Sequence, residues 1–378
     1  MNPNVNHLAV LRVGIPEKDA DLRYACGFTA PDPLIFLKTK RKAILVVNAM
    51  EAPRARRTVR GITVWTPDEL GLTDERRSSR REWVLALLKR EHLKKIAVPH
   101  SFPFGLAEAI RSAGIRLVLL EEAMIPARAI KRPDECAAIR HCQQAAAAAI
   151  RKAIRAIATA IPDAKGRLTL EGRLLTSERL RTMIRHWLLD WECEGPDLIV
   201  ACGAQGADPH ETGHGPLWAG QSIVLDVFPR HAHTGYWGDM TRTVVHGRAS
   251  PPLRTMYRAV LEAQRAVLAA IRPGVNAARL HRLAVETLAA HGFRTEIRKG
   301  RPVGFFHGTG HGVGLEIHEE PVLGSRPIRL RPGHVVTVEP GLYDPEVGAV
   351  RIEDTVVVTR HGADLLANCT KQLEWGGQ

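Results

Sequence analysis

Two pairs of β-rich runs, each interrupted by a polar turn, carry acidic residues in apolar surroundings. In the first pair, residues 221–245 read QSIVLDVFPRHAHTGYWGDMTRTVV, and each run holds one aspartate, Asp226 or Asp239. An aspartate between Leu225 and Val227 is costly to bury unless it is paired or bound to a cation. One such aspartate alone fits a structural hydrogen bond equally well. The two runs around a glycine-containing turn predict a β-hairpin.

The C-terminal part of the chain repeats this arrangement. Residues 334–359 read HVVTVEPGLYDPEVGAVRIEDTVVVT, with Glu339 after the first β-rich run and Glu353 inside the second. These carboxylates are 353 − 339 = 14 positions apart, compared with 239 − 226 = 13 in the first pair. Two hairpins with similarly spaced carboxylates suggest two related halves that face one another across a site.

A glycine-rich segment with three histidines lies between the two hairpins. Residues 307–321 read HGTGHGVGLEIHEEP, with His307, His311 and His318, and the glycines let the backbone approach a ligand closely. Four carboxylates would repel one another in the absence of cations. Together with an imidazole they predict an oxygen-rich site for two divalent ions, more suited to Mn²⁺, Co²⁺ or Fe²⁺ than to a structural zinc.

A further histidine motif, H-E-x-x-H at residues 210–214, matches the zinc site of one class of metalloprotease. That site requires a helix, because only a helix puts the two histidines on one face. The stretch PHETGHGP has a proline at each end and two internal glycines, and it has almost no apolar residue nearby. We therefore expect a loop here and no zinc site of this class.

The bulk properties indicate a cytoplasmic protein of two domains. The 378 residues are enough for two large cores. The chain has no apolar run near the ~20 residues that a membrane span requires, and residues 1–14 lack the pattern of a secretion signal. The six cysteines form no C-x-x-C pair, which is typical of reduced thiols in a cytosolic enzyme.

The chain is basic, since Lys plus Arg exceed Asp plus Glu by 53 − 40 = 13. Arginine is concentrated in residues 55–60 and 76–95, and a basic face of this kind could bind nucleic acid. These runs contain few aromatic residues for base stacking, and no nucleic-acid-binding motif accompanies them. We interpret them as a solvated arginine-rich face and expect no nucleic-acid partner.

The first 130 residues alternate strand-like and helical runs, a pattern typical of an α/β layer structure. The strand-like runs span 42–50, 94–100 and 115–122, and the helical runs span 83–93 and 105–114. None of these runs gathers metal ligands or an activated nucleophile. We therefore interpret this part as a supporting domain.

A long helix is predicted to begin at the sequence IKRPDE (130–135) and to reach Ile161. We place the domain boundary at its start, with a first domain at residues 1–130 and a catalytic domain at 131–378. Further helices are predicted at 252–271 and 277–291.

These motifs resemble those of the pita-bread (M24-type) metallopeptidases, a family that includes aminopeptidase P, prolidase and methionine aminopeptidase. HGTGHGVGLEIHE is similar to the signature of the proline-peptidase branch, GYWGDMTRTVV to an earlier motif, and EPG and RIEDTVVVT to later ones. The resemblance covers residues 131–360, and RYACGFTAPDPLIFL (23–37) is similar to the creatinase-type domain that accompanies it. It implies an α/β (α+β) fold class with a creatinase-like N-terminal α/β domain, followed by a pita-bread domain whose curved antiparallel sheet is covered by helices.

The resemblance also implies a dinuclear metal site with two divalent ions, for which Mn²⁺ is favoured and Co²⁺, Fe²⁺ or Zn²⁺ are alternatives. Asp239 and Glu353 would bridge both ions. The five ligands carried over by position are Asp226, Asp239, His311, Glu339 and Glu353.

Several residues are expected to act on the substrate or on protons. His318 matches a family histidine that handles the scissile carbonyl, and His210 lies close to the position of a substrate-contacting histidine. Glu339 is expected to shuttle protons, and Arg351 to orient the nearby ligand Glu353. His307 is expected to contact the substrate together with His210 and His318, whereas His214 is expected to be incidental.

The turn between the two aspartates departs from the family pattern. Thirteen positions separate Asp226 from Asp239, two more than in most members of the family. Loops tolerate insertions, so the carboxylates on the flanking strands need not move. His231 and His233 lie in this turn, and exposure at the surface is favoured over contact with the site.

The leading hypothesis is a dinuclear-metal peptidase that hydrolyses the Xaa-Pro bond at the N-terminus of peptides or dipeptides and, by family resemblance, forms a homodimer. One alternative is a metal-independent, creatinase-like C–N hydrolase on the same scaffold, and another is a binding module with an inactive site. Members of both classes lose metal ligands, whereas all five are present here.

The sequence leaves open whether the substrate is a dipeptide or a longer peptide. A dipeptidase must neutralise the free carboxylate of its substrate, and several bacterial prolidases have an arginine directly after H-E-x-P. Val322 has that position here, which favours longer peptides. Arg326 or an arginine of the first domain could serve instead.

Overall fold

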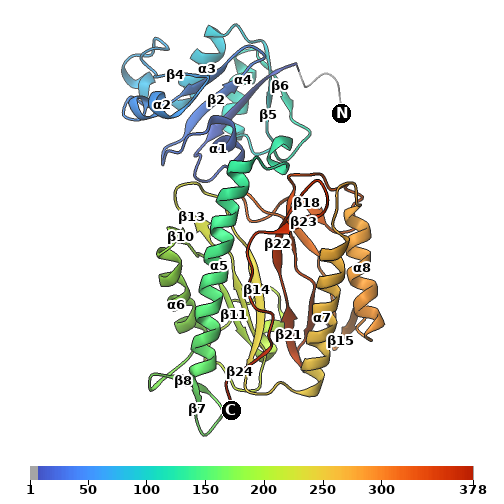
Figure 1. Cartoon of the computed structure of the whole chain (residues 1–378). Coiled ribbons are helices and arrows are strands. Elements are labelled where there is room, and N and C mark those ends of the chain that lie inside the picture. Colours follow the sequence, from blue (N-terminus) through green and yellow to red (C-terminus); the bar gives the residue numbers. More distant parts are fainter. Residues whose placement is uncertain (1–6, 378) are drawn as a thin grey trace. The chain divides into compact units, whose positions relative to one another are not determined.

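A computed structural model describes residues 7–377 and divides the chain into two compact units, Met1–Arg128 and Ala129–Gln378 (Figure 1). The boundary predicted from the sequence lies two residues beyond this division. Within the described residues, no helix combines the length and the apolar character needed to cross a bilayer.

The first unit contains a six-stranded sheet with the strand order β4-β3-β2-β1-β5-β6. Strand β2 is antiparallel to both of its neighbours, β1 and β3, whereas the pairs β1–β5, β3–β4 and β5–β6 are parallel. The strands are β1 Ala9–Gly14, β2 Leu34–Lys38, β3 Ala43–Val46, β4 Ile62–Trp65, β5 Lys95–Val98 and β6 Arg116–Leu119.

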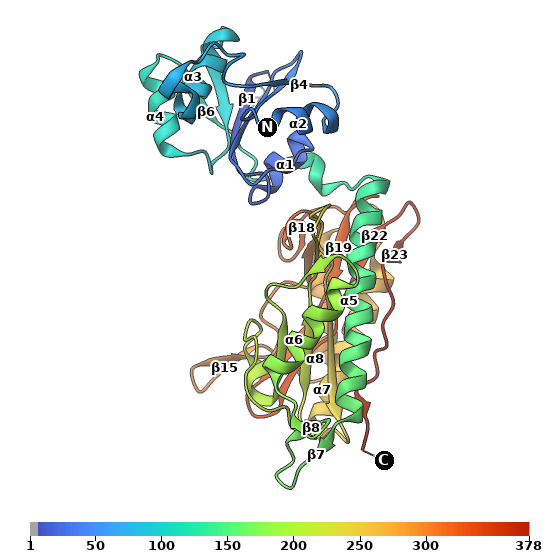
Figure 2. The same ribbon diagram turned by 90° about the vertical axis from the view of Figure 1, so that its left-hand side faces the viewer.

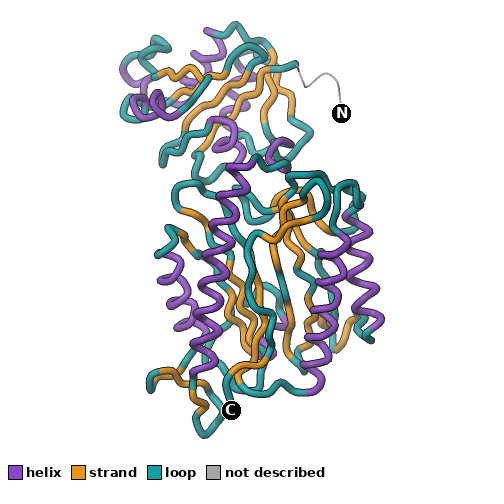
Figure 3. The backbone as a smooth tube through the Cα atoms, in the orientation of Figure 1, coloured by secondary structure: helices purple, strands orange, loops and turns teal. Residues whose placement is uncertain are grey.

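Helices cover both faces of this sheet. Side chains along each strand point alternately to one face and to the other, so each face can form a core with helices. In β2, Ile35 and Leu37 pack into one core with residues of α3 and α4, whereas Leu34 and Phe36 pack into the other with residues of α1 and α2. The helices are α1 Ala20–Cys26, α2 Ala52–Thr58, α3 Arg80–Arg90 and α4 Phe104–Ser112. The α/β layer pattern predicted from the sequence is therefore confirmed (Figure 3).

Four helices belong to the second unit, and the three that the sequence predicts are confirmed. The helix α5 ends two residues before the predicted Ile161, which is extended because it precedes a proline. The helices are α5 Pro133–Thr159, α6 Ser177–Leu189, α7 Pro251–Ala270 and α8 Ala277–Ala290.

The strands of the second unit form two larger sheets and several short hairpins. The four-stranded sheet has the order β11-β12-β14-β24, with β11 Ile199–Cys202, β12 Ile223–Val227, β14 Met240–His246 and β24 Glu374–Trp375. The five-stranded sheet has the order β18-β17-β19-β22-β23, with β17 Gly310–Gly312, β18 Glu319–Leu323, β19 Val335–Val338, β22 Asp354–Val358 and β23 Ala363–Leu365.

The short strands form three two-stranded ribbons and one three-stranded ribbon around these sheets. They are β7 Ile161–Pro162, β8 Leu168–Leu170 and β9 Arg173–Leu174, then β10 Cys193–Glu194 with β13 Arg230–His231, β15 Glu296–Arg298 with β16 Arg301–Val303, and β20 Gly341–Asp344 with β21 Gly348–Arg351.

Both predicted hairpins are present. Strands β12 and β14 pair antiparallel without a break in register, with Asp226 opposite Thr241. The extra length of the intervening turn is taken up beyond the ladder, where β13 pairs with β10. In the second hairpin β19 pairs with β22, and the β20–β21 ribbon lies between them in place of a simple turn.

Each pair of helices packs against one half of the second unit (Figures 1 and 2). Residues of α5 and α6 share a core with β11, β12 and β14, while residues of α7 and α8 share a core with β19 to β22. Hydrogen bonds join the halves, including Glu353 N to Thr241 O at 3.1 Å and Thr243 Oγ1 to Arg351 O at 3.0 Å. The two carboxylate-bearing hairpins are thereby brought together.

Candidate metal centre

Asp226 is fixed on both of its carboxylate oxygens. It lies in the buried strand β12, where Arg351 Nη2 donates to its Oδ2 at 2.6 Å and Thr241 Oγ1 donates to its Oδ1 at 2.8 Å. The guanidinium comes from the end of β21 in the other half of the unit. Asp226 is therefore a paired carboxylate whose orientation depends on both hairpins.

Thr241 lies between two carboxylates and has only one proton to donate. Its Oγ1 is 2.8 Å from Asp226 Oδ1 and also 2.8 Å from Glu353 Oε2. A hydroxyl donates one hydrogen bond at a time, so these two carboxylates compete for it. The other oxygen of Glu353, Oε1, is buried and has no hydrogen-bond partner among the described residues. A buried, unsatisfied carboxylate oxygen is costly unless a cation binds it.

Asp239 is held through its backbone, which leaves its side chain available. The side chain of Gln143, in α5, accepts from Asp239 N at 2.7 Å and donates to Asp239 O at 2.6 Å. Close packing of α5 makes this contact possible, because a Cβ on the preceding Gly238 would lie 2.6 Å from the carbonyl carbon of Cys142. Thr355 Oγ1 donates to the same Asp239 carbonyl at 2.8 Å.

His311 presents an imidazole lone pair to two carboxylates. Its Nδ1 is 3.1 Å from Gly312 O, an acceptor, so Nδ1 carries the proton in that contact. Burial lowers the pKa of His311 and favours the neutral ring. The unprotonated Nε2 then faces Asp239 Oδ2 at 3.6 Å and Glu339 Oε1 at 3.4 Å. Three acceptor groups facing one another in this way indicate that a cation belongs among them.

The donor set fits a divalent metal ion. Ligand atoms of Asp239, His311 and Glu353 lie within 4.8 Å of one another. Two donors that are about 2.1 Å from a shared ion lie roughly 3.0–3.4 Å apart, similar to the His311 contacts. Burial, followed by the charge of Glu353, raises the pKa of Asp239, and burial, followed by the charge of Glu339, raises the pKa of Glu353. These shifts mean that the metal-free cluster disfavours full ionisation, which positive ions would restore.

The guanidinium of Arg351 is hydrogen-bonded to Asp226. The sequence predicts that it orients Glu353, whereas its guanidinium contacts Asp226, and its Nη1 contacts Tyr343 Oη at 3.0 Å. Strand β21 ends at Arg351, so the long side chain extends across to β12 while Glu353 lies beyond the end of β21. The carboxylate that Arg351 contacts directly is therefore that of Asp226.

Both ring nitrogens of His307 are engaged within the protein. Its Nδ1 donates to Gly308 O at 2.7 Å, so its Nε2 accepts from Tyr343 Oη at 2.8 Å. Burial lowers the pKa of His307 and raises the pKa of Tyr343 to about 12, so both groups are neutral near pH 7. A continuous chain of hydrogen bonds thus runs from His307 through Tyr343 and Arg351 to Asp226.

His318 and His210 lie at the solvent-exposed side of this cluster. The rings of His318 and His311 meet edge to face, with centroids 4.3 Å apart. The charge of His210 contributes to lowering the pKa of both His307 and His318, which indicates that His210 lies near them.

The H-E-x-x-H stretch is a loop, as predicted, and contains no helix. The backbone of His214 is held by the side chain of Gln205, which accepts from His214 N at 2.9 Å and donates to His214 O at 3.0 Å. Among the described residues, the close group of ligand-type side chains is Asp239, His311 and Glu353, and it contains neither His214 nor Asp226 or Glu339.

Comparisons with known proteins agree with this geometry. The profile of metallopeptidase family M24 matches residues 137–360, more than half of the chain. The Xaa-Pro dipeptidase of Pyrococcus horikoshii is 30% identical over 289 residues, which cover 75% of this chain and 76% of that protein. The chain belongs to metallopeptidase family M24.

Other relatives are similar over a shorter segment. The uncharacterized peptidase YqhT of Bacillus subtilis is 39% identical over 178 residues, and this match covers 47% of the chain and 48% of the relative. The chain thus spans about half the length of several curated relatives that it matches. The named relatives support the proline-peptidase branch of the family.

Solved structures of family members match almost the whole chain. The Xaa-Pro dipeptidase from Bacillus anthracis has a TM-score of 0.82 at 25% identity, covering 97% of this chain and 94% of that chain. An X-Pro aminopeptidase from Thermotoga maritima also has a TM-score of 0.82, at 23% identity, and the match covers 99% of both chains. The predicted two-domain pita-bread fold is therefore confirmed.

The histidines of the lengthened turn form a separate cluster. His231 Nδ1 accepts from the backbone N of His233 at 3.1 Å and of Thr234 at 3.3 Å. The His231 ring lies 5.1 Å from that of His141, in α5, and its Nε2 is 3.8 Å from Glu192. Because Nδ1 accepts, Nε2 carries the proton in the neutral ring and is not free to bind a metal in this arrangement.

Sequence reasoning missed three residues that organise the site of this M24 protein: Gln143, Thr241 and Tyr343. Gln143 is fully buried in the alanine-rich helix α5, and a glutamine within an apolar run was the available signal. Thr241 and Tyr343 lie inside recognised motifs, but nothing in their spacing indicates which carboxylate or histidine they contact.

Proposed function

We propose that the chain is a dinuclear-metal exopeptidase that hydrolyses the Xaa-Pro bond at the N-terminus of peptides or dipeptides. The observation that carries this proposal is the His311 lone pair, which faces the buried carboxylate of Asp239 and the partly buried carboxylate of Glu339. Membership of family M24 and the names of the relatives, Xaa-Pro dipeptidase and prolidase, support the reaction class.

Five side chains would hold the two ions, for which Mn²⁺ is favoured. When bound, the ions supply Lewis acidity toward water and the scissile carbonyl. By family resemblance Asp239 and Glu353 would serve both ions, and their ligand atoms lie within 4.8 Å of one another. The proposed ligands are Asp226, Asp239, His311, Glu339 and Glu353.

Glu339 is the proposed proton carrier. Burial is the main cause that raises the pKa of its carboxyl group, which therefore takes up a proton more readily than an exposed glutamate. It follows β19 directly and lies 3.4 Å from His311 Nε2. In this position Glu339 would accept a proton from the attacking water and return it to the leaving amine.

The histidines would bind the substrate or position other side chains, and Arg351 would orient a metal ligand. His318 lies beside the ligand His311 and is exposed, so it would donate a hydrogen bond to the oxyanion that develops on the scissile carbonyl. His210 would contact the peptide from the loop opposite. His307 would act through Tyr343 as a positioning residue, since both of its nitrogens are engaged. Arg351 would hold Asp226 in its ligating orientation.

The cellular setting is part of the same proposal. All six cysteines are free thiols, which supports a cytoplasmic enzyme. A homodimer is proposed by family resemblance. The arginine-rich segments of the first unit are proposed to be solvated faces.

Removal of metal is expected to abolish activity. The protein is dialysed against a chelator, and hydrolysis of Xaa-Pro dipeptides and Xaa-Pro-Xaa tripeptides is followed before and after addition of Mn²⁺ or Co²⁺. We expect loss of at least about 99% of the activity and its recovery with either ion, because charge stabilisation is removed with the metal. Full turnover by metal-free protein would favour a creatinase-like hydrolase instead.

His210 and His214 are expected to respond differently to replacement by alanine. His210→Ala should lower kcat/KM roughly 100-fold, because a contact to the reacting peptide is lost. His214→Ala should change kcat/KM by less than about twofold, since only its backbone is anchored. Metal content, measured by elemental analysis, should remain unchanged in both. Loss of bound metal in both variants would instead support a zinc site at H-E-x-x-H.

A further inference from the structure

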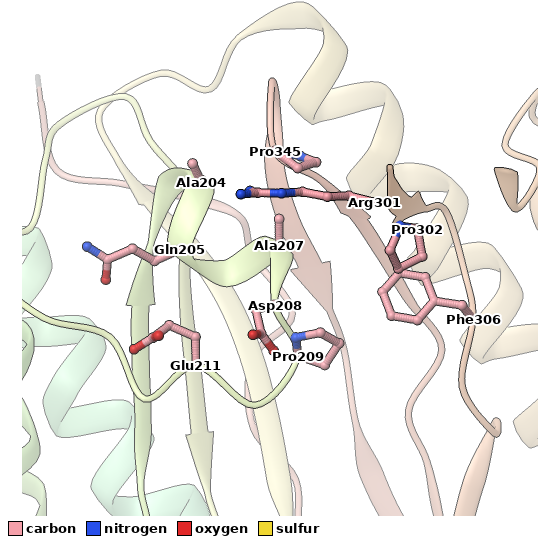
Figure 4. A pocket seen from close by; sticks show the side chains of 10 residues that line it. All are labelled: Ala204, Gln205, Ala207, Asp208, Pro209, Glu211, Arg301, Pro302, Phe306 and Pro345. Carbon is pink, nitrogen blue, oxygen red and sulfur yellow. The ribbon is translucent and has the colours of Figure 1, made fainter. Parts of the chain in front are cut away.

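A cavity of about 520 Å³ lies beside the site and contains an arginine (Figure 4). It is bounded by the 3₁₀ turn Gly203–Ala207, by the loop at 208–211, and by residues of the β15–β16 ribbon and the segment that follows it. The side chain of Arg301 extends from β16 across the cavity toward the 3₁₀ turn, as Figure 4 shows. The cavity therefore has a cationic group on one wall.

Two further residues that line the cavity are neighbours of the metal centre. Phe306 lines the cavity, and its ring centroid is 5.2 Å from that of Tyr343. Pro209 also lines it, and its carbonyl is 3.4 Å from Arg351 Nη1. Since Tyr343 and Arg351 hold His307 and Asp226, a ligand in the cavity would lie next to the catalytic cluster.

Arg301 has a defined position relative to this cluster. Three residues after it, Gly304 pairs with Tyr343 through two backbone hydrogen bonds of 3.0 and 3.1 Å. Arg298 Nη1 is 2.8 Å from Asp344, and Lys299 Nζ is 2.8 Å from Glu346, so two ion pairs join the ribbon to the β20–β21 turn. The backbone pairing is the stronger constraint, because exposed ion pairs contribute little.

The guanidinium of Arg301 makes no hydrogen bond or ion pair with the described residues, although two carboxylates share its cavity. One oxygen of Asp208 accepts from His210 N at 3.1 Å, and one oxygen of Glu211 accepts from Gly213 N at 2.9 Å. Each of these acidic residues thus has one carboxylate oxygen bound to the backbone of the loop. Arg326, the other arginine considered from the sequence, is paired with Glu320 at 2.6 Å.

We propose that Arg301 is a specificity-determining residue that binds a carboxylate of the peptide substrate in this cavity. The inference rests on the proposed function. A guanidinium binds a carboxylate through two parallel hydrogen bonds, and Arg301 has no other partner for these donors among the described residues. The carboxylate has two possible sources: the C-terminus of a short peptide, or the side chain of an acidic residue next to the scissile bond.

The test combines charge-altering variants with matched substrates. Arg301→Met removes the charge at nearly constant length, and Arg301→Lys retains it. Lys299→Met is the control, because it removes one positive charge from the same ribbon at a residue that does not line the cavity. Ala-Pro and Ala-Pro-Ala with free or amidated termini test the C-terminal source, and the amidated Glu-Pro and Gln-Pro counterparts test the side-chain source.

Arg301→Met is expected to raise KM roughly five- to tenfold for the charged member of one substrate pair. The KM of the neutral member and the kcat of both members should change by less than about twofold. Arg301→Lys should recover part of the loss, whereas Lys299→Met should resemble the wild type. A selective effect in either pair supports the inference and identifies the source. The inference is overturned if Arg301→Met leaves the ratio of KM between the charged and the neutral substrate unchanged in both pairs. It is also overturned if Lys299→Met has the same effect as Arg301→Met.

This outcome can be separated from failure of the proposed function. If the wild-type protein hydrolyses none of these substrates after reconstitution with Mn²⁺ or Co²⁺, the proposed function is wrong and the inference falls with it. If the wild-type protein is active but its charge preference does not depend on Arg301, the inference alone is wrong.

Discussion

Glu353→Gln is expected to lower kcat/KM by roughly a thousandfold or more and to reduce bound metal below one ion per chain. Glu353 is fully buried in the cluster, and its Oε1 has no partner among the described residues. The amide keeps the size of the side chain but cannot supply the charge of a bridging carboxylate. The measurements are steady-state kinetics with an Xaa-Pro peptide and elemental analysis of the dialysed protein.

The same substitution should maintain or raise the stability of the metal-free protein. Four carboxylates share the site, and replacement of one by a neutral amide relieves repulsion and adds a donor for Asp239. We expect metal-free Glu353→Gln to melt at or above the temperature of metal-free wild type, and Mn²⁺ to raise the melting temperature of the wild type only.

The control is Glu346→Gln, which neutralises an exposed carboxylate in the β20–β21 turn. It should leave metal content and activity unchanged. Normal metal content and turnover in Glu353→Gln would contradict the proposed bridging role of Glu353.

The carboxylates and the two hairpins could be predicted because their signal is local. An acidic residue such as Asp226 inside an apolar strand is unusual in any fold, so the sequence alone marks it for pairing or metal binding. Alternation of apolar and polar residues predicted the strands on either side of it. The same local reasoning rejected a helix at His210, where prolines and glycines prevent one.

The contacts that orient these carboxylates depend on residues far apart in the chain. Arg351 and Asp226 are 125 positions apart, and their ion pair requires β21 of one half to meet β12 of the other. Gln143 holds Asp239 across 96 positions because α5 packs against Gly238. No rule of residue spacing predicts either contact. The sequence therefore indicates which residues are candidate ligands but not which contacts orient them.

Arg242→Met is expected to lower the free energy of unfolding by about 3–5 kcal/mol, because it removes one partner of a buried ion pair. Arg242 is 1% exposed, and its guanidinium contacts Asp354 Oδ1 at 2.7 Å and the carbonyls of Glu353 at 2.5 Å and Cys369 at 3.0 Å. Methionine fills part of the space but leaves these acceptors without a donor. Urea denaturation of the metal-free protein measures the loss.

Two further variants separate the buried pair from a general effect of arginine. Arg254→Met removes an exposed arginine 3.9 Å from Glu374 and should change stability by no more than about 0.5 kcal/mol. Arg242→Met leaves Asp354 with two other partners, Lys371 Nζ at 2.5 Å and Gln264 Nε2 at 2.9 Å, so the additional change Asp354→Leu should lower the stability further. Lys371, 2.5 Å from Asp354, keeps its contact with Gln264 in that double variant.

If Arg242→Met costs less than about 1 kcal/mol, the pair does not stabilise the junction between the halves. The carbonyl of Glu353 must then be held by the remaining backbone contacts alone.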